Sequence, residues 1–478
     1  MVAKMQLTKT DFIQYLKCPK SLWLLKHEPE NYPAGEFSAF LEKITREGYQ
    51  VEGYVKEFFQ HEKTRFANFQ SEFSSIDGLF ARADVIEITQ DGETILYEVK
   101  SSNRVKKDND HNHVKDACFQ KICAERSGQA IDKVFIVHLN GNYVRNGDIN
   151  PSDLLIFSDV TDQVGNILGE TKGEIDSALE LLQQDNIDRD SCSCLQSSRA
   201  NHCDTFSMFN PNVPVPSIYS LPRLSARKRD DLIGRNIFAL NEIPEGYSLS
   251  DIQQTVLAAS KSGEPQINID SMREFLGKFE FPLYFLDYET FASAIPITNG
   301  SSPHKHFPFQ YSLHILSQDG EIKHREYLER KCLLPLPLIE QMEKDIGCEG
   351  SVVSWHASFE KTQNKEMSVM FREKEGFLLN INERMVDLED VFKKDYVDFR
   401  FDGSTSIKKI LPVVCPHLSY NDLEIKDGSL AMEAWERMIS SDPEESQKIA
   451  SNLLKYCKLD TFAMVEIYRF LNAQLAVE

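Results

Sequence analysis

Residues 78–100 read GLFARADVIEITQDGETILYEVK, and their pattern is the strongest indication of fold in the first half of the chain. Its β-branched and apolar residues predict strands at 79–88 and 94–99, and the Gln90-Asp91-Gly92 sequence between them is typical of a hairpin turn. Further elements are expected as helices at 7–25, 40–59, 116–127 and 173–184 and as a strand at 133–139. Helices around a hairpin and a third strand predict a mixed α/β domain.

The hairpin carries polar residues in a pattern that suits phosphodiester hydrolysis. Glu98 and Lys100 lie two apart on a strand, so both side chains leave the same face, which Asp84 of the partner strand can approach. Two carboxylates can hold Mg²⁺ or Mn²⁺, and a lysine can act on the attacking water or on developing charge. The alternative is an exposed strand face that carries an ordinary salt bridge.

This half of the chain resembles the RecB-like nucleases of the PD-(D/E)XK superfamily, in particular their four-cysteine CRISPR-associated members. Asp84 matches the motif aspartate, Glu98-Val99-Lys100 the E-x-K motif, and Gln120 the glutamine of the following helix. The resemblance implies a restriction-endonuclease-like fold and catalysis by these residues, with metal held by Asp84 and Glu98. The family's tyrosine after that glutamine is replaced by Ala124.

Glu52 stands where relatives of this family often place a metal-binding histidine. A glutamate can also hold a hard cation, so we expect Glu52 to be a metal ligand. The alternative is a solvated glutamate on a helix surface.

Three of the ten cysteines, Cys192, Cys194 and Cys203, lie within a dozen polar residues. Such crowding suggests ligation of a metal or a cluster. The family resemblance implies that these three and Cys18 bind a [4Fe–4S] cluster, for which thiolates are the usual ligands. The short Cys-x-Cys spacing and the neighbouring His202 keep a structural Zn²⁺ open as an alternative. The absence of any metal is a third reading.

The second half begins with the apolar sequence FPLYFLDYETF at residues 281–291. Asp287 and Glu289 share one face of this predicted strand, where two carboxylates are costly unless a cation compensates them. Tyr456 and Asp460 lie four apart, on one face of a predicted helix. Strands expected at 307–316 and 321–328, followed by helix-rich sequence, are the order of a ribonuclease-H-like fold.

The D-x-E and Y-x-x-x-D elements resemble those of the DEDD 3′–5′ exonucleases, which use two metal ions. The resemblance implies that metal is held by Asp287, Glu289 and Asp460, and that Tyr456 positions the attacking water. Glu360, in WHASFEK, stands where relatives carry aspartate, and His356 where they carry asparagine. Asp387 is a candidate substitute ligand. The alternative is a domain that kept the fold with lost or weakened catalysis.

Three domains are expected: a RecB-like nuclease domain with the cysteine cluster (1–207), a helical linker (208–275) and an exonuclease-like domain (276–478). The linker resembles a helix-hairpin-helix element, although a simple spacer fits equally well. Nearly end to end, the chain resembles a bacterial family known only as a domain of unknown function, in which a RecB-like nuclease precedes an exonuclease-like domain.

Composition bounds the function. Hydrophobic residues make up 41% and charged residues 27% of the 478 residues, as in globular proteins. No signal peptide or membrane-spanning run is apparent, so a cytoplasmic protein without a membrane partner is expected. The net charge of −21 counts against a nucleic-acid partner, but residues 104–107 and the run from Arg223 to Arg229 are locally basic.

The expected function is a metal-dependent DNA nuclease, exonucleolytic, acting in DNA repair, processing or defence against foreign DNA. One alternative is an RNase that acts through the DEDD domain. Another is a nucleic-acid-binding subunit with weakened catalysis.

Overall fold

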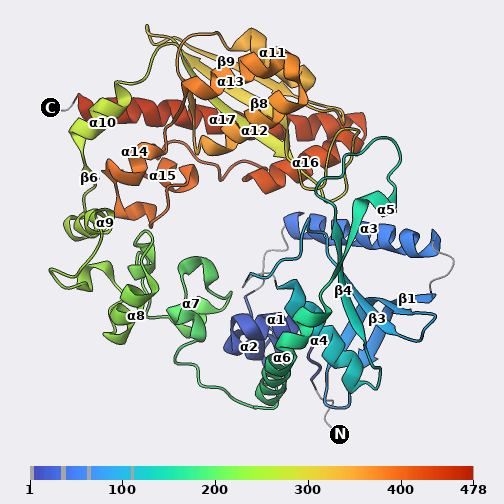
Figure 1. The fold of residues 1–478 in the computed structure, drawn as a ribbon. Helices are drawn as coiled ribbons and strands as arrows, with labels where there is room; N and C mark the ends of the chain where they lie inside the picture. Colours follow the sequence, from blue (N-terminus) through green and yellow to red (C-terminus); the bar gives the residue numbers. More distant parts are fainter. Residues whose placement is uncertain (1–4, 34–38, 62–65, 109–111, 477–478) are drawn as a thin grey trace. The chain divides into compact units, whose positions relative to one another are not determined.

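The structure, a computed structural model, describes residues 5–33, 39–61, 66–108 and 112–476 (Figure 1). The chain forms two compact units. Unit 1 comprises Met1–Pro211 and the short segment Ser293–Lys305, and unit 2 comprises Asn212–Ala292 and His306–Glu478. Most of the predicted linker, residues 212–275, therefore lies in unit 2. The first residues of the predicted RecB-like domain (1–4) and the last residues of the predicted exonuclease-like domain (477–478) lie outside the described ranges.

Unit 1 is built around a mixed sheet with the strand order β1-β2-β3-β4-β5. Its strands are β1 (Phe66–Ser74), β2 (Phe80–Ile88), β3 (Thr94–Val99), β4 (Lys133–Leu139) and β5 (Leu155–Asp159). β3 and β4 run parallel and the other neighbours antiparallel. The parallel pair follows from the helical crossover between these two strands, which a tight turn could not provide.

Helices cover both faces of this sheet. The helices of unit 1 are α1 (Lys9–Lys17), α2 (Pro19–His27), α3 (Ala39–His61), α4 (His113–Arg126), α5 (Pro151–Leu154), α6 (Thr161–Leu181) and α7 (Phe206–Phe209), of which α7 packs beside the cysteines. Leu96 of β3 packs in a core with α1, α4 and α6, whereas its neighbour Tyr97 packs in a second core with α3. Because side chains alternate along a strand, Glu98 shares the face of Leu96 and points toward α1 and α4.

The β1–β2 pairing is irregular at Asp84. Ala83 belongs to the core beneath α4, but Val85, two residues later, belongs to the core beneath α3. Opposite Asp84, Gln70 of β1 has a φ of +54°, in the left-handed region that residues with a side chain rarely occupy. At Asp84, the predicted motif aspartate, the side chains of β2 therefore switch the face of the sheet to which odd-numbered residues point.

Unit 2 contains a second mixed sheet, with the strand order β11-β10-β7-β8-β9. Its strands are β7 (Leu283–Phe291), β8 (Phe307–Leu316), β9 (Ile322–Leu328), β10 (Val352–Ser354) and β11 (Met385–Asp387). β7, β8 and β9 pair antiparallel, while β10 runs parallel to both β7 and β11. A separate short pair joins β6 (Gln266–Ile267) to β12 (Tyr396–Val397).

The helices of unit 2 are α8 (Ala226–Gly234), α9 (Asp251–Ser262), α10 (Ile269–Leu276), α11 (Leu336–Asp345), α12 (Ser358–Met370), α13 (Glu375–Arg384), α14 (Asp390–Lys394), α15 (Ile407–Val414), α16 (Gly428–Ser440) and α17 (Pro443–Leu475). α8 and α9 belong to a separate hydrophobic cluster, while other helices pack on both faces of the five-stranded sheet. Tyr284, Leu286 and Tyr288 of β7 pack toward α11, α12 and α13. The long α17 lies along the opposite face, toward which Asp287 and Glu289 alternate (Figure 1).

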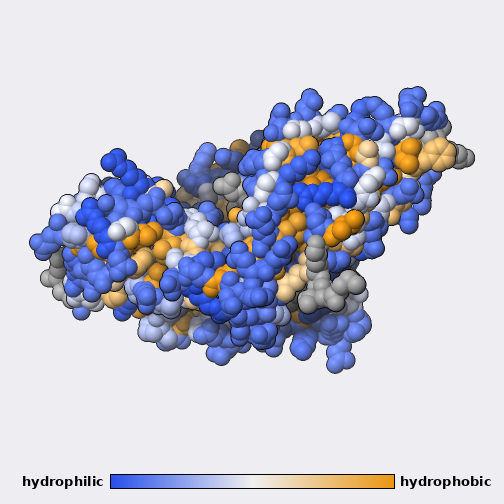
Figure 2. Space-filling model, turned by 90° about the horizontal axis from the view of Figure 1, so that it is seen from below, coloured by the Kyte–Doolittle hydropathy of each residue, from blue (hydrophilic) through white to orange (hydrophobic). Residues whose placement is uncertain are grey.

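A mixed α/β architecture was expected and is confirmed. The sequence analysis did not identify β1 and β5 of the first sheet, β10 and β11 of the second, or the short pair of β6 and β12. Within the described ranges, no helix is long and apolar enough to cross a membrane. The face drawn in Figure 2 is largely hydrophilic, with hydrophobic residues in small groups.

Candidate functional site

The end of the β2–β3 hairpin gathers the polar residues predicted for unit 1. Oδ2 of Asp84 accepts a hydrogen bond from the backbone N–H of Val99 at 2.7 Å. Glu98 is fully buried, and Nζ of Lys100 lies 2.9 Å from its Oε1. Gln120 on α4 donates a hydrogen bond to Oε2 of Glu98. The four residues therefore lie together, as the hairpin prediction required.

Two further residues of this site were not identified from the sequence. Nζ of Lys9, the first residue of α1, lies 2.6 Å from Oε1 of Glu98. Asp116 on α4 contacts Nζ of Lys100 at 2.5 Å. Lys9 and Glu98 are 89 residues apart in the chain, so no local spacing connects them. Glu98 thus accepts hydrogen bonds from two lysines and one glutamine.

The charges of this site shift its two carboxyl groups in opposite directions. Burial opposes ionisation of Glu98, but Lys100 and Lys9 outweigh it and lower the pKa of Glu98 to about 2. Burial and the neighbouring charge of Glu98 raise the pKa of Asp84 to about 7. A bound divalent cation would favour ionisation of both groups, because it adds positive charge where two acids compete.

Glu52 contributes to the same site from α3. It is half-buried and accepts a hydrogen bond from Nε2 of Gln70 at 3.0 Å. Burial raises the pKa of Glu52, and its charge also helps to raise the pKa of Asp84. Glu52 therefore acts electrostatically on Asp84 from α3. Ala124, where the resemblance predicted a tyrosine, is fully buried in the core beneath α4.

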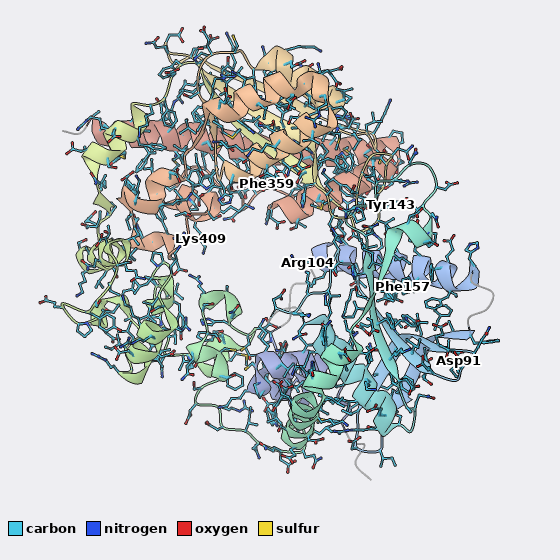
Figure 3. All side chains as sticks on the ribbon, in the orientation of Figure 1. Asp91, Arg104, Tyr143, Phe157, Phe359 and Lys409 are labelled. Atoms are coloured by element: carbon cyan, nitrogen blue, oxygen red, sulfur yellow. The ribbon has the colours of Figure 1, made fainter. Side chains whose placement is uncertain are left out.

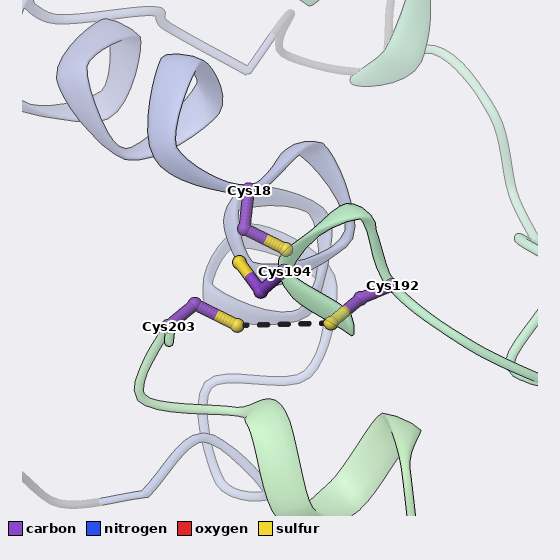
Figure 4. Close-up of side chains that lie close together, drawn as sticks. All are labelled: Cys18, Cys192, Cys194 and Cys203. Atoms are coloured by element: carbon purple, nitrogen blue, oxygen red, sulfur yellow. Dashed lines mark hydrogen bonds between the residues drawn. The ribbon is translucent and has the colours of Figure 1, made fainter. Parts of the chain in front are cut away.

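Cys18, Cys192, Cys194 and Cys203 form one compact group in unit 1 (Figure 4). All four are buried, and their sulfur atoms lie within 4.8 Å of one another, with 4.0 Å between Sγ of Cys192 and Sγ of Cys203. Cys18 occupies the junction of α1 and α2, and the other three come from the loop after α6. The predicted early and late cysteines are thus brought together across most of unit 1.

The surroundings of this group suit thiolate ligands. Nδ2 of Asn210 donates a hydrogen bond to Sγ of Cys192 at 3.3 Å. Hydrogen bonding among the four thiols lowers the pKa of Cys203, to about 7, and that of Cys192, while the pKa values of Cys18 and Cys194 are raised. His202 stacks on the ring of Phe206 with 3.5 Å between ring centroids and is not part of the four-residue group. The four sulfur atoms therefore form a donor set without this histidine.

An open cavity of about 530 Å³ in unit 2 is lined by carboxylates from three elements. Asp287 and Glu289 lie on β7, Glu360 on α12, and Asp460 on α17. Tyr456 lines the same cavity one helical turn before Asp460. All five residues predicted for this half of the chain therefore surround one cavity.

Burial makes ionisation of these acids unfavourable. It raises the pKa of Asp287 and of Glu289 well above their usual range, and the charge of Asp460 adds to both shifts. Burial raises the pKa of Glu360 to about 8 and that of Asp460 to about 6. Buried carboxylates in such numbers need cations or protons as partners. The cavity is therefore a candidate cation site.

Three residues of this cavity region were not identified as functional from the sequence. Tyr420 donates a hydrogen bond from its hydroxyl to Oδ1 of Asp460 at 2.6 Å. Lys408 on α15 lines the cavity and places its Nζ 5.5 Å from the ring centroid of Tyr456. The thiol of Cys457 lies 3.6 Å from Oδ2 of Asp287. Cys457 is fully buried.

A hydrogen bond joins His356 to Asp387 beside the cavity. His356 lines the cavity with a φ of +60°, and its backbone N–H donates to Oδ1 of Asp387 at 3.0 Å. The same oxygen accepts the backbone N–H of Glu389 at 3.1 Å. Asp387 does not line the cavity. Its carboxylate instead accepts backbone hydrogen bonds from His356 and Glu389 and so supports the backbone at His356.

The predicted basic stretches differ in their exposure. Arg104, at the start of the first stretch, is exposed (Figure 3). In the second stretch Arg223 and Arg227 are exposed, but Arg229 is buried. Exposed arginines can contact a phosphate backbone, so the first stretch and part of the second present usable positive charge.

Comparison with known proteins gives two similarities. The signature of a family described as a domain of unknown function (DUF2779) matches residues 284–406, which include all of β7 except its first residue and the whole of α12. An uncharacterized protein, MG366, of Mycoplasma genitalium is 27% identical over 210 residues. The match covers 39% of this chain and 32% of the relative, so the chain spans about a third of that relative's length.

Proposed function

We propose that this protein is a metal-dependent nuclease that hydrolyses phosphodiester bonds of DNA. The observation that carries the proposal is the cavity of unit 2, in which Asp287, Glu289, Glu360 and Asp460 converge from three elements. Buried carboxylates around an open cavity are the ligands that hard divalent cations require. Two such cations would activate water and stabilise the leaving oxygen in phosphodiester hydrolysis.

The chain's own residues would divide the work in unit 2. Asp287, Glu289 and Asp460 would hold Mg²⁺ or Mn²⁺, with Glu360 completing the acidic wall. Tyr456 would orient the attacking water, whose oxygen bonds to phosphorus while the bond from phosphorus to the leaving oxygen breaks. The antiparallel strands β7, β8 and β9, followed by helix-rich sequence, support a ribonuclease-H-like fold for this unit.

Unit 1 would carry a second nuclease site. Asp84, Glu98 and Glu52 would hold the cation, and Lys100 would stabilise charge on the attacked phosphate. The hairpin, the parallel crossover through α4 and the position of Gln120 on that helix support a RecB-like fold of the PD-(D/E)XK type.

A binding role without cleavage is a second candidate for unit 1, and the contacts of Glu98 favour it. Lys9, Lys100 and Gln120 already donate to both oxygens of this carboxylate. A cation could bind Glu98 only if at least one of these donors moved or shared its oxygen. The two candidates differ in whether Lys100 is needed for cutting or only for binding.

The four cysteines would hold a structural metal centre. The resemblance to four-cysteine nucleases favours a [4Fe–4S] cluster. The sulfur separation of 4.0 Å instead suits one tetrahedral Zn²⁺, since Zn–S bonds of roughly 2.3 Å place thiolates roughly 3.8 Å apart. A four-iron cluster would need a wider spacing of the same ligands.

Cleavage of end-labelled DNA and RNA strands tests the proposal. The full chain, purified without oxygen, is incubated with Mg²⁺ or Mn²⁺ and single- or double-stranded substrates, beside Lys100→Ala, Asp287→Ala and the double variant. We expect the wild type to cut DNA. Lys100→Ala should remove the cleavage due to unit 1, and Asp287→Ala the cleavage due to unit 2. Absence of DNA cleavage under every condition contradicts the proposal, while cleavage of RNA alone favours an RNase acting through unit 2.

A further inference from the structure

Lys408 is a cation on the wall of an otherwise acidic cavity. It lies on α15, half-buried, and lines the cavity together with Asp287, Glu289 and Asp460. Its charge lowers the pKa of Glu289 and of Asp460, against the larger effect of burial. Lys408 therefore acts electrostatically on the acids that would bind metal.

Aromatic rings rather than carboxylates hold this lysine in place. Its Nζ lies 5.7 Å from the ring centroid of Tyr420 and 5.5 Å from that of Tyr456. With the described carboxylates it forms no ion pair, whereas Nζ of Lys100 in unit 1 lies within 2.9 Å of Glu98. A cation over ring faces keeps its positive charge and its N–H donors for another partner.

An anionic substrate needs such a partner here. A phosphodiester that enters this cavity meets four carboxylates, and bound divalent cations compensate only the acids that they contact. A fixed ammonium group on the wall offers hydrogen bonds to a non-bridging phosphate oxygen. Hydrogen bonds between charged groups are roughly twice as strong as neutral ones.

We propose that Lys408 binds the phosphate group of the substrate in the unit 2 cavity. The inference rests on the proposed nuclease function and adds a substrate-binding residue to it. Because Tyr456 lies under the same ammonium group, Lys408 would also place the phosphate beside the residue that orients water.

The test compares Lys408 with its neighbour Lys409, which is exposed on the same helix (Figure 3). Lys408→Ala, Lys408→Arg and Lys409→Ala are made in a Lys100→Ala background, which disables the site of unit 1. Hydrolysis of the p-nitrophenyl ester of thymidine 5′-monophosphate with Mn²⁺ gives KM and kcat, and inhibition by thymidine 5′-monophosphate gives a binding constant without turnover.

We expect Lys408→Ala to raise both KM and the inhibition constant by roughly tenfold or more, because a charge-assisted hydrogen bond is lost. Lys408→Arg should restore most of the binding, and Lys409→Ala should leave it unchanged. With single-stranded DNA, Lys408→Ala should also lower the salt dependence of binding by roughly 0.7 in the log–log slope.

Two outcomes overturn the inference in distinguishable ways. If Lys408→Ala hydrolyses the ester with unchanged KM and inhibition constant, Lys408 does not bind the phosphate, but the proposed nuclease function of unit 2 is not contradicted. If the Lys100→Ala protein itself neither hydrolyses the ester nor binds the nucleotide, both the role of Lys408 and the nuclease function of unit 2 are contradicted.

Discussion

Glu360, on the cavity wall of unit 2, is one methylene longer than the aspartate expected there from the DEDD resemblance. Glu360 lies on α12, 3% exposed, with burial raising its pKa to about 8. A carboxyl group in this setting is costly to ionise unless a cation reaches it. Its position on the cavity wall is thus compatible with metal binding, and its extra methylene does not remove it from the cavity.

Replacing Glu360 by glutamine should separate stability from catalysis. Its pKa in the folded, metal-free protein is above the unfolded value, so the unfolded state binds fewer protons between pH 4.5 and about 8. The wild type should therefore lose stability as the pH rises through this window. Glu360→Gln should remove that loss, a gain of roughly 1–3 kcal/mol at pH 8, while cleavage by unit 2 falls.

Urea unfolding in EDTA at pH 5 and pH 8, together with cleavage assays in Mn²⁺, checks this prediction. Glu373→Gln, on the exposed surface after α12, is the matched control. Full activity in Glu360→Gln would show that this carboxylate does not bind the catalytic metal.

Lys9 is a residue whose removal should strengthen cation binding in unit 1. Its Nζ shares Oε1 of Glu98 with Lys100, so it competes with any metal ion for that oxygen. We expect Lys9→Ala to bind Mn²⁺ at least threefold more tightly, measured as free Mn²⁺ by electron paramagnetic resonance in an Asp287→Ala background. Lys17→Ala, exposed on the same helix, should leave binding unchanged. Weaker binding in Lys9→Ala would mean that Lys9 supports the cation site instead.

At the scale of elements, the sequence predicted those whose pattern is local. The hairpin of β2 and β3 and the strands β4 and β8 were expected with nearly the observed bounds, because apolar runs and turn residues mark them. β1 was not predicted because its sequence FANFQSEFS is half-exposed and polar, and β5 was not predicted because it has only five residues.

The sites divide in the same way. Asp84, Glu98 and Lys100 were found because they lie on one hairpin, and Asp287 with Glu289 because they lie on one strand. Lys9 and Lys408 reach their sites only through tertiary packing, which a single sequence does not reveal. The irregularity at Asp84 also has no signal in the sequence, since glutamine rather than glycine occupies the left-handed position opposite it.

Two glycines of unit 2 allow a test of close packing between elements. Gly350, before β10, and Gly320, in the β8–β9 turn, have nearly equal φ values of +88° and +90°. A Cβ atom on Gly350 would lie 2.2 Å from the carbonyl oxygen of Pro282, whereas one on Gly320 would meet nothing within 4 Å. The two positions share backbone strain and differ in available space.

We expect Gly320→Ala to cost roughly 1–2 kcal/mol, the strain of a left-handed alanine. Gly350→Ala should cost clearly more, because the backbone at the start of β7 and β10 must also move apart. Urea unfolding followed by tryptophan fluorescence of unit 2 measures both. Equal losses would indicate that the backbone near Pro282 adjusts without cost.

At the scale of the whole molecule, the net charge of −21 is explained in part by the two sites. Both gather buried acids, and bound cations would offset some of this charge. In the proposed function, a nucleic acid would have to avoid the remaining acids and contact local positive groups such as Arg104 and Lys408. Affinity for DNA should therefore depend on divalent cations as well as on salt.

The cysteine group links distant parts of unit 1, and the metal centre proposed for it should be needed for the stability of that unit. Cys18 and the residues from Cys192 to Cys203 are brought together only by tertiary structure, so a shared metal closes a very long loop of chain. An iron-sulfur cluster would show a broad visible absorption with iron and sulfide, and zinc would show neither. Elemental analysis of protein purified without oxygen distinguishes them.

Removal of this metal should destabilise unit 1 and leave unit 2 intact. Trp23 on α2, bonded through Nε1 to the carbonyl of Gln184, reports on unit 1, while Trp355 and Trp435 report on unit 2. With Trp23 as the remaining tryptophan, Cys18→Ser should lower the melting temperature by about 5 °C or more. The exposed Cys348→Ser is the control. An unchanged Trp23 transition in Cys18→Ser would mean that the four thiols stabilise the fold by packing alone.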